Sequence, residues 1–197
     1  SGAGFVDIAF PSTKAFPFWR PSITETADGT LLFAFADNEN SNAYTTSRGG
    51  IGLYRYTPAG GWVASQEERW PGLFVGNPSM TTLGGKVYVA NAESDMGFIG
   101  PTETSLPGRY TRHISVKEVS GSANLVWTEV WRTHAAECPT DAHCPEVDPT
   151  LDNNGDGWAR SEFPALTTMG AGLAASWISW GAKGVAVHAS VSDALAT

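Results

Sequence analysis

The distribution of apolar positions along the chain repeats three times. Each copy has a proline, two further residues, a threonine, a glycine-bearing turn and then an apolar run of strand character. The copies are "RPSITETADGTLLFAF" from Arg20, "NPSMTTLGGKVYVAN" from Asn77 and "FPALTTMGAGLAASW" from Phe163. Short apolar runs on either side of a Gly or Asp-Gly turn are typical of a β-hairpin, so each copy predicts one hairpin.

The segments that follow the three copies also resemble one another. Apolar residues alternate in "GIGLYRYTPAGGW" up to Trp62, in "RHISVKEVSGSANLVW" up to Trp127 and in "GVAVHASVSDALAT". The unit is therefore a hairpin, a loop of variable length and a second hairpin, which together form the four-stranded sheet of a β-propeller blade. No segment keeps an apolar spacing at the helical period, which argues against helical repeats, while a two-sheet sandwich remains the alternative.

The repeats define the predicted organisation of the chain. We expect an all-β partial β-propeller over residues 1–197, with four-stranded antiparallel blades at about 18–70, 71–131 and 160–197 and an insertion at 132–159. Propellers close with four to eight blades, so about three blades predict a larger assembly. The remaining blades would come from a nicked partner chain, a second copy or further sequence. Because the three repeats differ strongly from one another, a nicked partner chain is favoured over a self-assembling duplicated unit.

Composition and charge exclude several classes of function. Apolar residues make up 42% and charged residues 16% of the sequence, with 22 glycines, as in a strand-rich globular protein. The net charge of −8 and the lack of a basic stripe argue against a nucleic-acid partner. A membrane span is not expected, because there is no apolar run of about 18 residues.

The first repeat resembles the first blade of the sialidase superfamily. The residues concerned are "FWRPSITETADGTLLFAFAD", the strand after it and "TPAGGW", where an arginine beside a proline opens the blade and a degenerate Asp-box turn precedes a tryptophan. The resemblance implies that Arg20 binds a substrate carboxylate and that Asp37 or Glu39 is the general acid. It also implies two more arginines and a Tyr–Glu nucleophile pair in later blades. In the family one residue separates the arginine from the proline, and here none does, which bears on the side that Arg20 faces.

Other polar residues at matching places complete the expected site. Asn77 takes the place of Arg20 in the second repeat, and Arg112 and His113 directly precede a strand, so we expect them near the central channel as substrate-binding residues. The resulting hypothesis is a secreted glycoside hydrolase of sialidase-like type acting on an acidic carbohydrate. Two alternatives stand beside it: a non-catalytic carbohydrate- or protein-binding propeller, and a polysaccharide lyase that relies on Arg112 and His113.

The insertion carries two motifs of its own. Cys138 and Cys144 lie close together among prolines, which favours a local disulfide and an exported protein. A zinc site with the flanking histidines is the weaker interpretation, because the spacing fits no zinc pattern.

The second motif in the insertion is "DPTLDNNGDGWARSEF". Asp152, Asn154 and Asp156 alternate as in the first half of an EF-hand loop, but Phe163 stands where the twelfth ligand belongs. We expect a structural calcium ion here, with a plain polar turn as the alternative.

Overall fold

The computed structural model describes residues 18–38, 49–69, 74–94, 112–121, 125–133, 160–181 and 184–192, and within them every regular element is a strand. The strands are β1 (Phe18–Glu25), β2 (Leu31–Asn38), β3 (Gly49–Thr57), β4 (Gly61–Arg69), β5 (Phe74–Leu83), β6 (Lys86–Ser94), β7 (Arg112–Ser120), β8 (Val126–Arg132), β9 (Arg160–Met169), β10 (Gly172–Gly181) and β11 (Gly184–Ser192). Among these residues there is no helix long and apolar enough to cross a bilayer.

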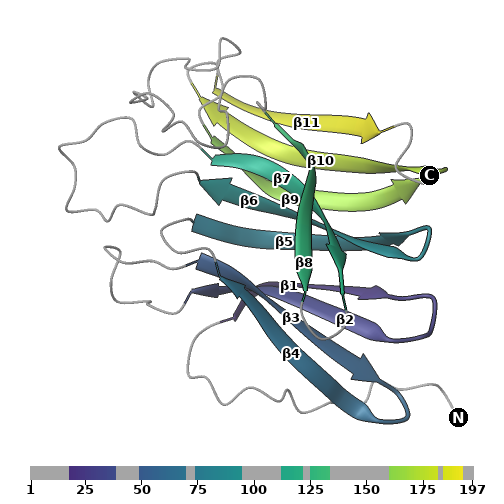
Figure 1. Ribbon diagram of the computed structural model, residues 1–197. Coiled ribbons are helices and arrows are strands. Elements are labelled where there is room, and N and C mark those ends of the chain that lie inside the picture. Colours follow the sequence, from purple (N-terminus) through teal and green to yellow (C-terminus); the bar gives the residue numbers. More distant parts are fainter. Residues whose placement is uncertain are drawn as a thin grey trace, which may run out of the picture.

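The strands form three successive antiparallel meanders, which confirms the predicted partial propeller. Blade 1 is the sheet β1-β2-β3-β4, blade 2 contains β5 to β8 and blade 3 contains β9 to β11 (Figure 1). A single parallel pair, Arg112 with Arg160, joins the sheets of blades 2 and 3. The three blades make an open row in which the innermost strands β1, β5 and β9 are neighbours.

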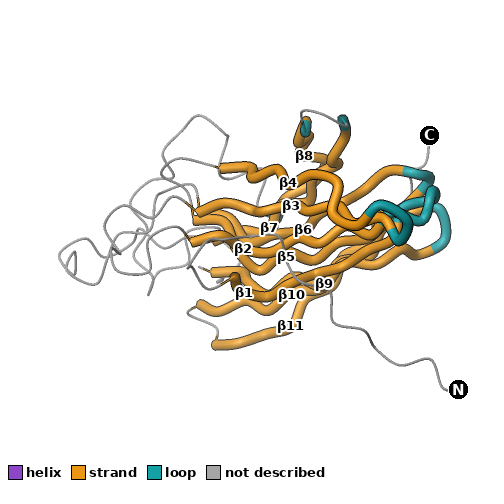
Figure 2. Tube along the Cα trace, turned by 90° about the horizontal axis from the view of Figure 1, so that it is seen from below, coloured by secondary structure: helices purple, strands orange, loops and turns teal. Residues whose placement is uncertain are grey.

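The turns of the hairpins β1–β2, β3–β4, β5–β6 and β9–β10 lie at one end of the row, which we call the turn end (Figure 2). Gly84 and Gly85 join β5 to β6 with φ angles of 58° and 80°, as a two-residue hairpin turn of the primed type requires. At the opposite end, called the loop end, the inner strands begin and the second strand of each blade finishes. The second strand of each blade is connected to the third at the loop end, through long segments in blades 1 and 2 and through two residues between β10 and β11 in blade 3.

Each inner strand is interrupted near its repeated proline. The pairing of β1 shifts between Trp19 and Ser22, that of β5 between Gly76 and Ser79, and that of β9 opposite Ser176 to Ile178. A bulge admits proline, which has no N–H for the ladder, and the strands therefore begin before the proline rather than after it. Asn77 and Phe163, which directly precede their prolines, have left-handed φ angles of 55° and 57°.

The serine after the proline joins one blade to the next. Ser22 Oγ accepts a hydrogen bond from the backbone N–H of Met80 at 2.9 Å, and Ser79 Oγ accepts one from Leu166 N–H at 2.9 Å. The third repeat has Ala165 at this place. The serine of the repeated Pro-Ser pair thus makes a blade-to-blade contact between inner strands.

Two apolar cores lie between the blades. The first packs Leu32, Ala34, Ile51 and Leu53 of blade 1 against Met80, Val87, Val89 and Val119 of blade 2. The second packs Tyr88, Ala90 and Val116 of blade 2 against Leu166, Leu173 and Ala175 of blade 3. The middle blade is therefore buried on both faces, which explains why its strand β6 is buried continuously from residue 87 to 93.

Candidate functional site

The predicted site residues that the structure describes lie, by backbone position, at the loop end. Arg20 lies in the bulge of β1, and Asp37 pairs with Phe18 on the neighbouring strand β2. Asn77 lies in the bulge of β5, and Arg112 begins β7. For Arg20, Asp37 and Arg112 the description covers the backbone only, and six further predicted residues lie outside the described part: Glu39, Cys138, Cys144, Asp152, Asn154 and Asp156.

The strand pairing aligns the three blades residue by residue. Asp37 pairs with Phe18, Glu93 with Val75, and Ser179 with Ser161, so Asp37, Glu93 and Ser179 occupy one repeat position. An acidic residue therefore ends the second strand in the first two blades. Of the two acidic residues, Glu93 is the one whose side-chain contacts the structure describes.

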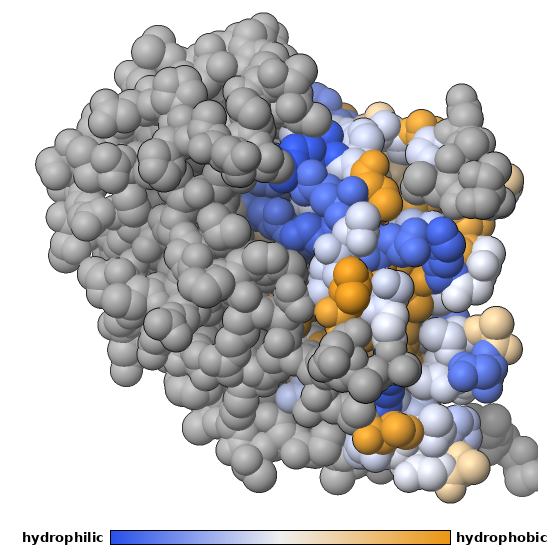
Figure 3. Space-filling model, viewed as in Figure 1, coloured by the Kyte–Doolittle hydropathy of each residue, from blue (hydrophilic) through white to orange (hydrophobic). Residues whose placement is uncertain are grey.

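A group of charged and ionisable side chains lies at the loop end of blade 2, on the face turned toward blade 1, and three of them, Glu93, His113 and Lys117, are buried. The charge cluster, as we call it, consists of Glu93, His113, Lys117, Glu129 and Arg132. They come from the second, third and fourth strands of the blade, at the alternating positions that continue the apolar face of Val87, Val89 and Val119. In Figure 3 hydrophilic side chains lie beside apolar ones across the described strands.

Three neighbours hold the Glu93 carboxylate. The Lys117 ammonium forms a salt bridge and hydrogen bond with Oε1, and both side chains are more than 90% buried, at 9% and 8% exposure. Asn91 Nδ2 donates to the same oxygen at 2.9 Å, and His113 Nε2 lies 3.5 Å from Oε2. A carboxylate removed from water is thus compensated by an ion pair and hydrogen bonds.

The second carboxylate of the cluster has its own partners. Arg132 donates to Glu129 through Nε at 2.7 Å and Nη2 at 2.9 Å, which is the bidentate geometry of a strong guanidinium–carboxylate pair. Ser115 Oγ donates to Glu129 Oε2 at 2.8 Å.

The environment fixes the protonation of Glu93. Burial by itself raises the pKa of this carboxyl, but the His113 contact, the positive charge of Lys117 and the Asn91 amide together outweigh it and lower the pKa to about 2. Glu93 therefore remains a carboxylate at any pH near neutrality and has no proton to give to a substrate.

A metal ion does not suit this arrangement. Ligand atoms of Glu93, His113 and Glu129 lie within 4.8 Å of one another, as a metal site would need. However, Lys117 and Arg132 already neutralise the two carboxylates, and a divalent cation would face both positive groups at close range. The cluster is a charge-balanced network that positions side chains at the loop end.

His113 lies at the start of β7, the third strand of blade 2, as expected, and it is 6% exposed and packed beside Glu93. Its side chain lies on the same face of the sheet as that of Glu93, its cross-strand partner.

Sequence reasoning did not single out Lys117, Glu129 or Arg132. One of them leaves a trace in the sequence: Lys117 is a charged residue at an inward position of β7, on the same face as Val119. An inward charge on a strand needs a partner of opposite sign, yet the sequence does not say which acid supplies it.

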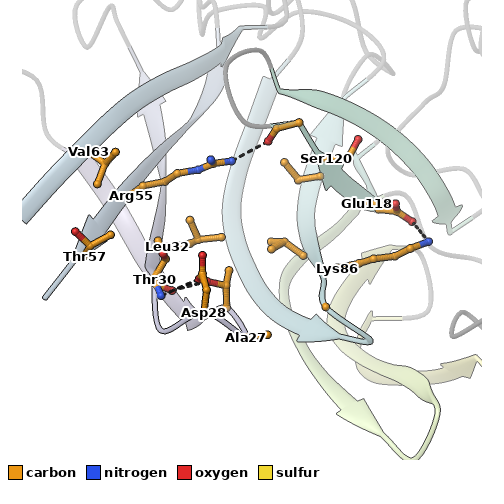
Figure 4. A pocket seen from close by; sticks show the side chains of 15 residues that line it. Ala27, Asp28, Thr30, Leu32, Arg55, Thr57, Val63, Lys86, Glu118 and Ser120 are labelled. Atoms are coloured by element: carbon orange, nitrogen blue, oxygen red, sulfur yellow. Dashed lines mark hydrogen bonds and ion pairs between the residues drawn. The ribbon is translucent and has the colours of Figure 1, made fainter. Parts of the chain in front are cut away.

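A separate hollow of about 490 Å³ opens between blades 1 and 2 at the turn end (Figure 4). Its charged groups have partners: Lys86 Nζ lies 3.1 Å from Glu118 Oε2, and Arg55 Nη2 donates to the Gly121 carbonyl at 2.9 Å. Asp28 caps its own turn by accepting from Thr26 Oγ1 and from Thr30 N–H. Because these groups serve the turns, and the hollow lies far from the loop end, we do not assign the candidate site here.

Comparisons with known proteins agree with the blade architecture. No family model matches the sequence, and no curated protein matches it. Among solved structures, a Trypanosoma rangeli sialidase in complex with 2,3-difluorosialic acid, a covalent intermediate, matches with a TM-score of 0.53 and 13% identity. The match covers 89% of this chain and 28% of the sialidase, so the chain spans less than a third of that protein. The chain is therefore similar to a sialidase in its fold.

Proposed function

We propose that this chain contributes the first blades of a sialidase-like propeller that acts as a glycoside hydrolase on an acidic carbohydrate. The observation that carries the proposal is the pairing of β1 with β2, because it brings the backbone of Asp37 opposite Phe18, two residues before Arg20. The similar fold of a sialidase that was solved with a bound sialic acid derivative supports the same substrate class.

In this proposal Arg20 binds the substrate and Asp37 supplies the proton. A guanidinium binds a sugar carboxylate through two parallel hydrogen bonds, which fixes the orientation of the sugar ring. A carboxylic acid nearby then protonates the glycosidic oxygen as the bond to the leaving group breaks. Because Glu93 is held ionised, with its pKa near 2, it cannot take this role, and Asp37 or Glu39 remains the general acid. The nucleophile belongs to blades outside this chain.

The lyase alternative relies on Arg112 and His113. With 6% of its surface exposed and Glu93 beside it, His113 has little access to a polysaccharide. The hydrolase is therefore the better supported of the two enzyme classes.

The test is a comparison of Arg20→Lys with a control, Arg55→Lys, which lies at the turn end. Saturation-transfer NMR would measure binding of sialic acid and of a neutral methyl glycoside. We expect the wild-type chain to prefer the acidic sugar and Arg20→Lys to lose most of that binding, by about tenfold or more, because the bidentate contact is lost. Equal binding of both sugars, or equal effects of the two variants, would sink the proposal.

Turnover distinguishes the remaining alternative. Hydrolysis of a fluorogenic sialoside by the assembled propeller, lost in Asp37→Asn, supports the hydrolase. Binding that depends on Arg20 without turnover assigns a non-catalytic carbohydrate-binding propeller.

The insertion has two proposed features that stabilise rather than catalyse. We propose a structural calcium ion held by Asp152, Asn154 and Asp156, and a disulfide between Cys138 and Cys144 in a secreted protein. An unchanged melting temperature in chelator would remove the calcium, and two free thiols in the unreduced protein would remove the disulfide.

A further inference from the structure

The sheets of blades 2 and 3 join at a pair of arginines. Arg112, the first residue of β7, pairs in parallel with Arg160, the first residue of β9. Both strands begin at the loop end, where the candidate site lies. Because neighbouring strands lie about 4.8 Å apart, the backbone brings two arginines of different blades to one place beside the candidate site.

The strand pairing extends this place into a row across four strands. Arg112 also pairs with Ser94, the last residue of β6, and Arg160 also pairs with Trp180 on β10. Directly paired residues occupy the same face of a sheet, so the four residues stand on one face. The row therefore combines a hydroxyl, two positive charges and a large aromatic residue, which are residue types that recur in sites for polar ligands.

The opposite face of these strands is committed to other contacts. His113 and Ser161 directly follow the two arginines and are 6% and 0% exposed. Ser161 shares a hydrogen bond of 2.9 Å with the Ser179 hydroxyl, and His113 lies beside Glu93 in the charge cluster. Since successive residues of a strand occupy opposite faces, the arginine pair stands apart from the charge cluster.

The arginine pair has more positive charge than its strand neighbours balance. Like charges at paired positions are unfavourable, so such a pair requires anions. Of the residues that the structure describes, Glu93 and Glu162 are the acids near the pair in strand register. Glu93 stands on the opposite face and is bound by Lys117. Glu162, two residues after Arg160, stands on the arginine face and can balance one guanidinium. The second guanidinium is left for an anion from outside these strands.

We propose that Arg112 and Arg160 bind a second anionic group of the substrate, which is therefore an oligosaccharide with at least two acidic units. The inference rests on the proposed function, in which Arg20 binds the first carboxylate. The inner strands β1, β5 and β9 are neighbours, so Arg20 and Arg160 stand on the first and third inner strands of one row. A chain of acidic sugars that crosses β5 meets both positions, and each guanidinium offers a carboxylate two parallel hydrogen bonds.

A ligand series that varies the number of carboxylates tests this proposal. NMR titration of the whole chain would compare short oligomers of sialic acid with sialic acid linked to lactose, which is extended by neutral sugars and has a single carboxylate. We expect the oligomers to bind at least about tenfold more tightly, because they add a charge-assisted contact. Oligomers that bind no more tightly than the sialic acid–lactose conjugate would overturn the second anion site and leave the role of Arg20 intact.

Variants of the pair locate the additional affinity. Arg112→Gln or Arg160→Gln should reduce the affinity for the oligomers to that for the sialic acid–lactose conjugate and leave binding of the conjugate unchanged. Lys86→Gln removes the same charge at the turn end and is the matched control, which should affect neither ligand. Without ligand, the melting temperatures of the three variants should be similar. Equal loss of both ligands in Arg160→Gln, or a melting temperature far below that of the control, would show that the arginines serve the fold instead.

Arg20→Lys separates this inference from the proposed function. It should weaken the sialic acid–lactose conjugate and the oligomers alike, whereas the pair variants should weaken the oligomers alone. Binding of the conjugate that is insensitive to Arg20→Lys would overturn the proposed function and this inference with it.

Discussion

Blades 1 and 2 fill the same repeat positions with opposite chemistry. Phe35 is equivalent to Asn91, Gly52 to Ser115 and Tyr54 to Lys117. In blade 1 the ring of Phe35 lies over Gly52 and packs on Tyr54 with a centroid distance of 5.0 Å, and Tyr54 meets the edge of Trp62. In blade 2 the same layer holds the charge cluster. The same blade backbone thus accommodates either an aromatic layer, as in blade 1, or an ionic layer, as in blade 2. We expect substitutions in the two layers to destabilise the protein by different mechanisms.

The ionic layer should be the more sensitive to loss of one member. Lys117→Met leaves the buried Glu93 carboxylate without its cation, and we expect the free energy of unfolding to fall by about 3–5 kcal/mol. Lys86→Met, which breaks the exposed pair with Glu118, is the control and should change stability little. Urea denaturation measures both. A double variant that adds Glu93→Gln should recover much of the loss, and equal effects of the two lysine variants would contradict the comparison.

Acid should unfold the protein through the ionic layer. The pKa of Glu93 is lowered from 4.5 to about 2 in the folded state, so its contribution is fully present above pH 4.5 and is lost as the pH falls toward 2. The difference corresponds to roughly 3 kcal/mol. Stability measured from pH 6 to pH 3 should decline less steeply in Glu93→Gln than in the wild type. Parallel pH profiles would show that Glu93 is not the group responsible.

The aromatic layer should instead be destabilised by added side-chain volume. A Cβ on Gly52 would come within 2.6 Å of the buried Phe35 ring, so Gly52→Ala should cost about 1–3 kcal/mol of unfolding free energy at every pH. Phe35→Leu in the same chain makes room for the methyl group and should reduce the added cost. If Gly52→Ala is as stable as the wild type, the close contact does not constrain blade 1.

The smallest expected effect concerns the hydrogen bond between the inner strands of blades 2 and 3. Ser79→Ala removes the hydroxyl that accepts the Leu166 N–H, with an expected loss of about 1 kcal/mol. Ser79→Thr keeps a hydroxyl and is the matched control in thermal denaturation. A larger loss with threonine than with alanine would mean that space at the bulge, rather than the hydrogen bond, matters there.

The blade pattern could be predicted from the sequence because it is local. Alternating residues such as Ile51 and Leu53 define a strand face, and the paired glycines at 84 and 85 define a hairpin turn, whatever the rest of the chain does. The candidate site could be predicted in part, since Asn77 and the neighbourhood of Arg20 follow from the repeat. The partners of Glu93 could not, because Lys117, Glu129 and Arg132 come from other strands whose register is set by the sheet.

The sequence by itself determined the strand content, the hairpin turns and the repeat, since side-chain alternation and turn chemistry act over a few residues. Tertiary structure decided the rest. Phe163 adopts a left-handed φ of 57° that a bulky residue avoids, because the bulge and the Ser79 contact to Leu166 hold the inner strand there. The sheet of blade 2 likewise buried His113 and brought Lys117, His113 and Asn91 to the Glu93 carboxylate, which keeps it ionised, because burial and neighbouring charge depend on which strands pair.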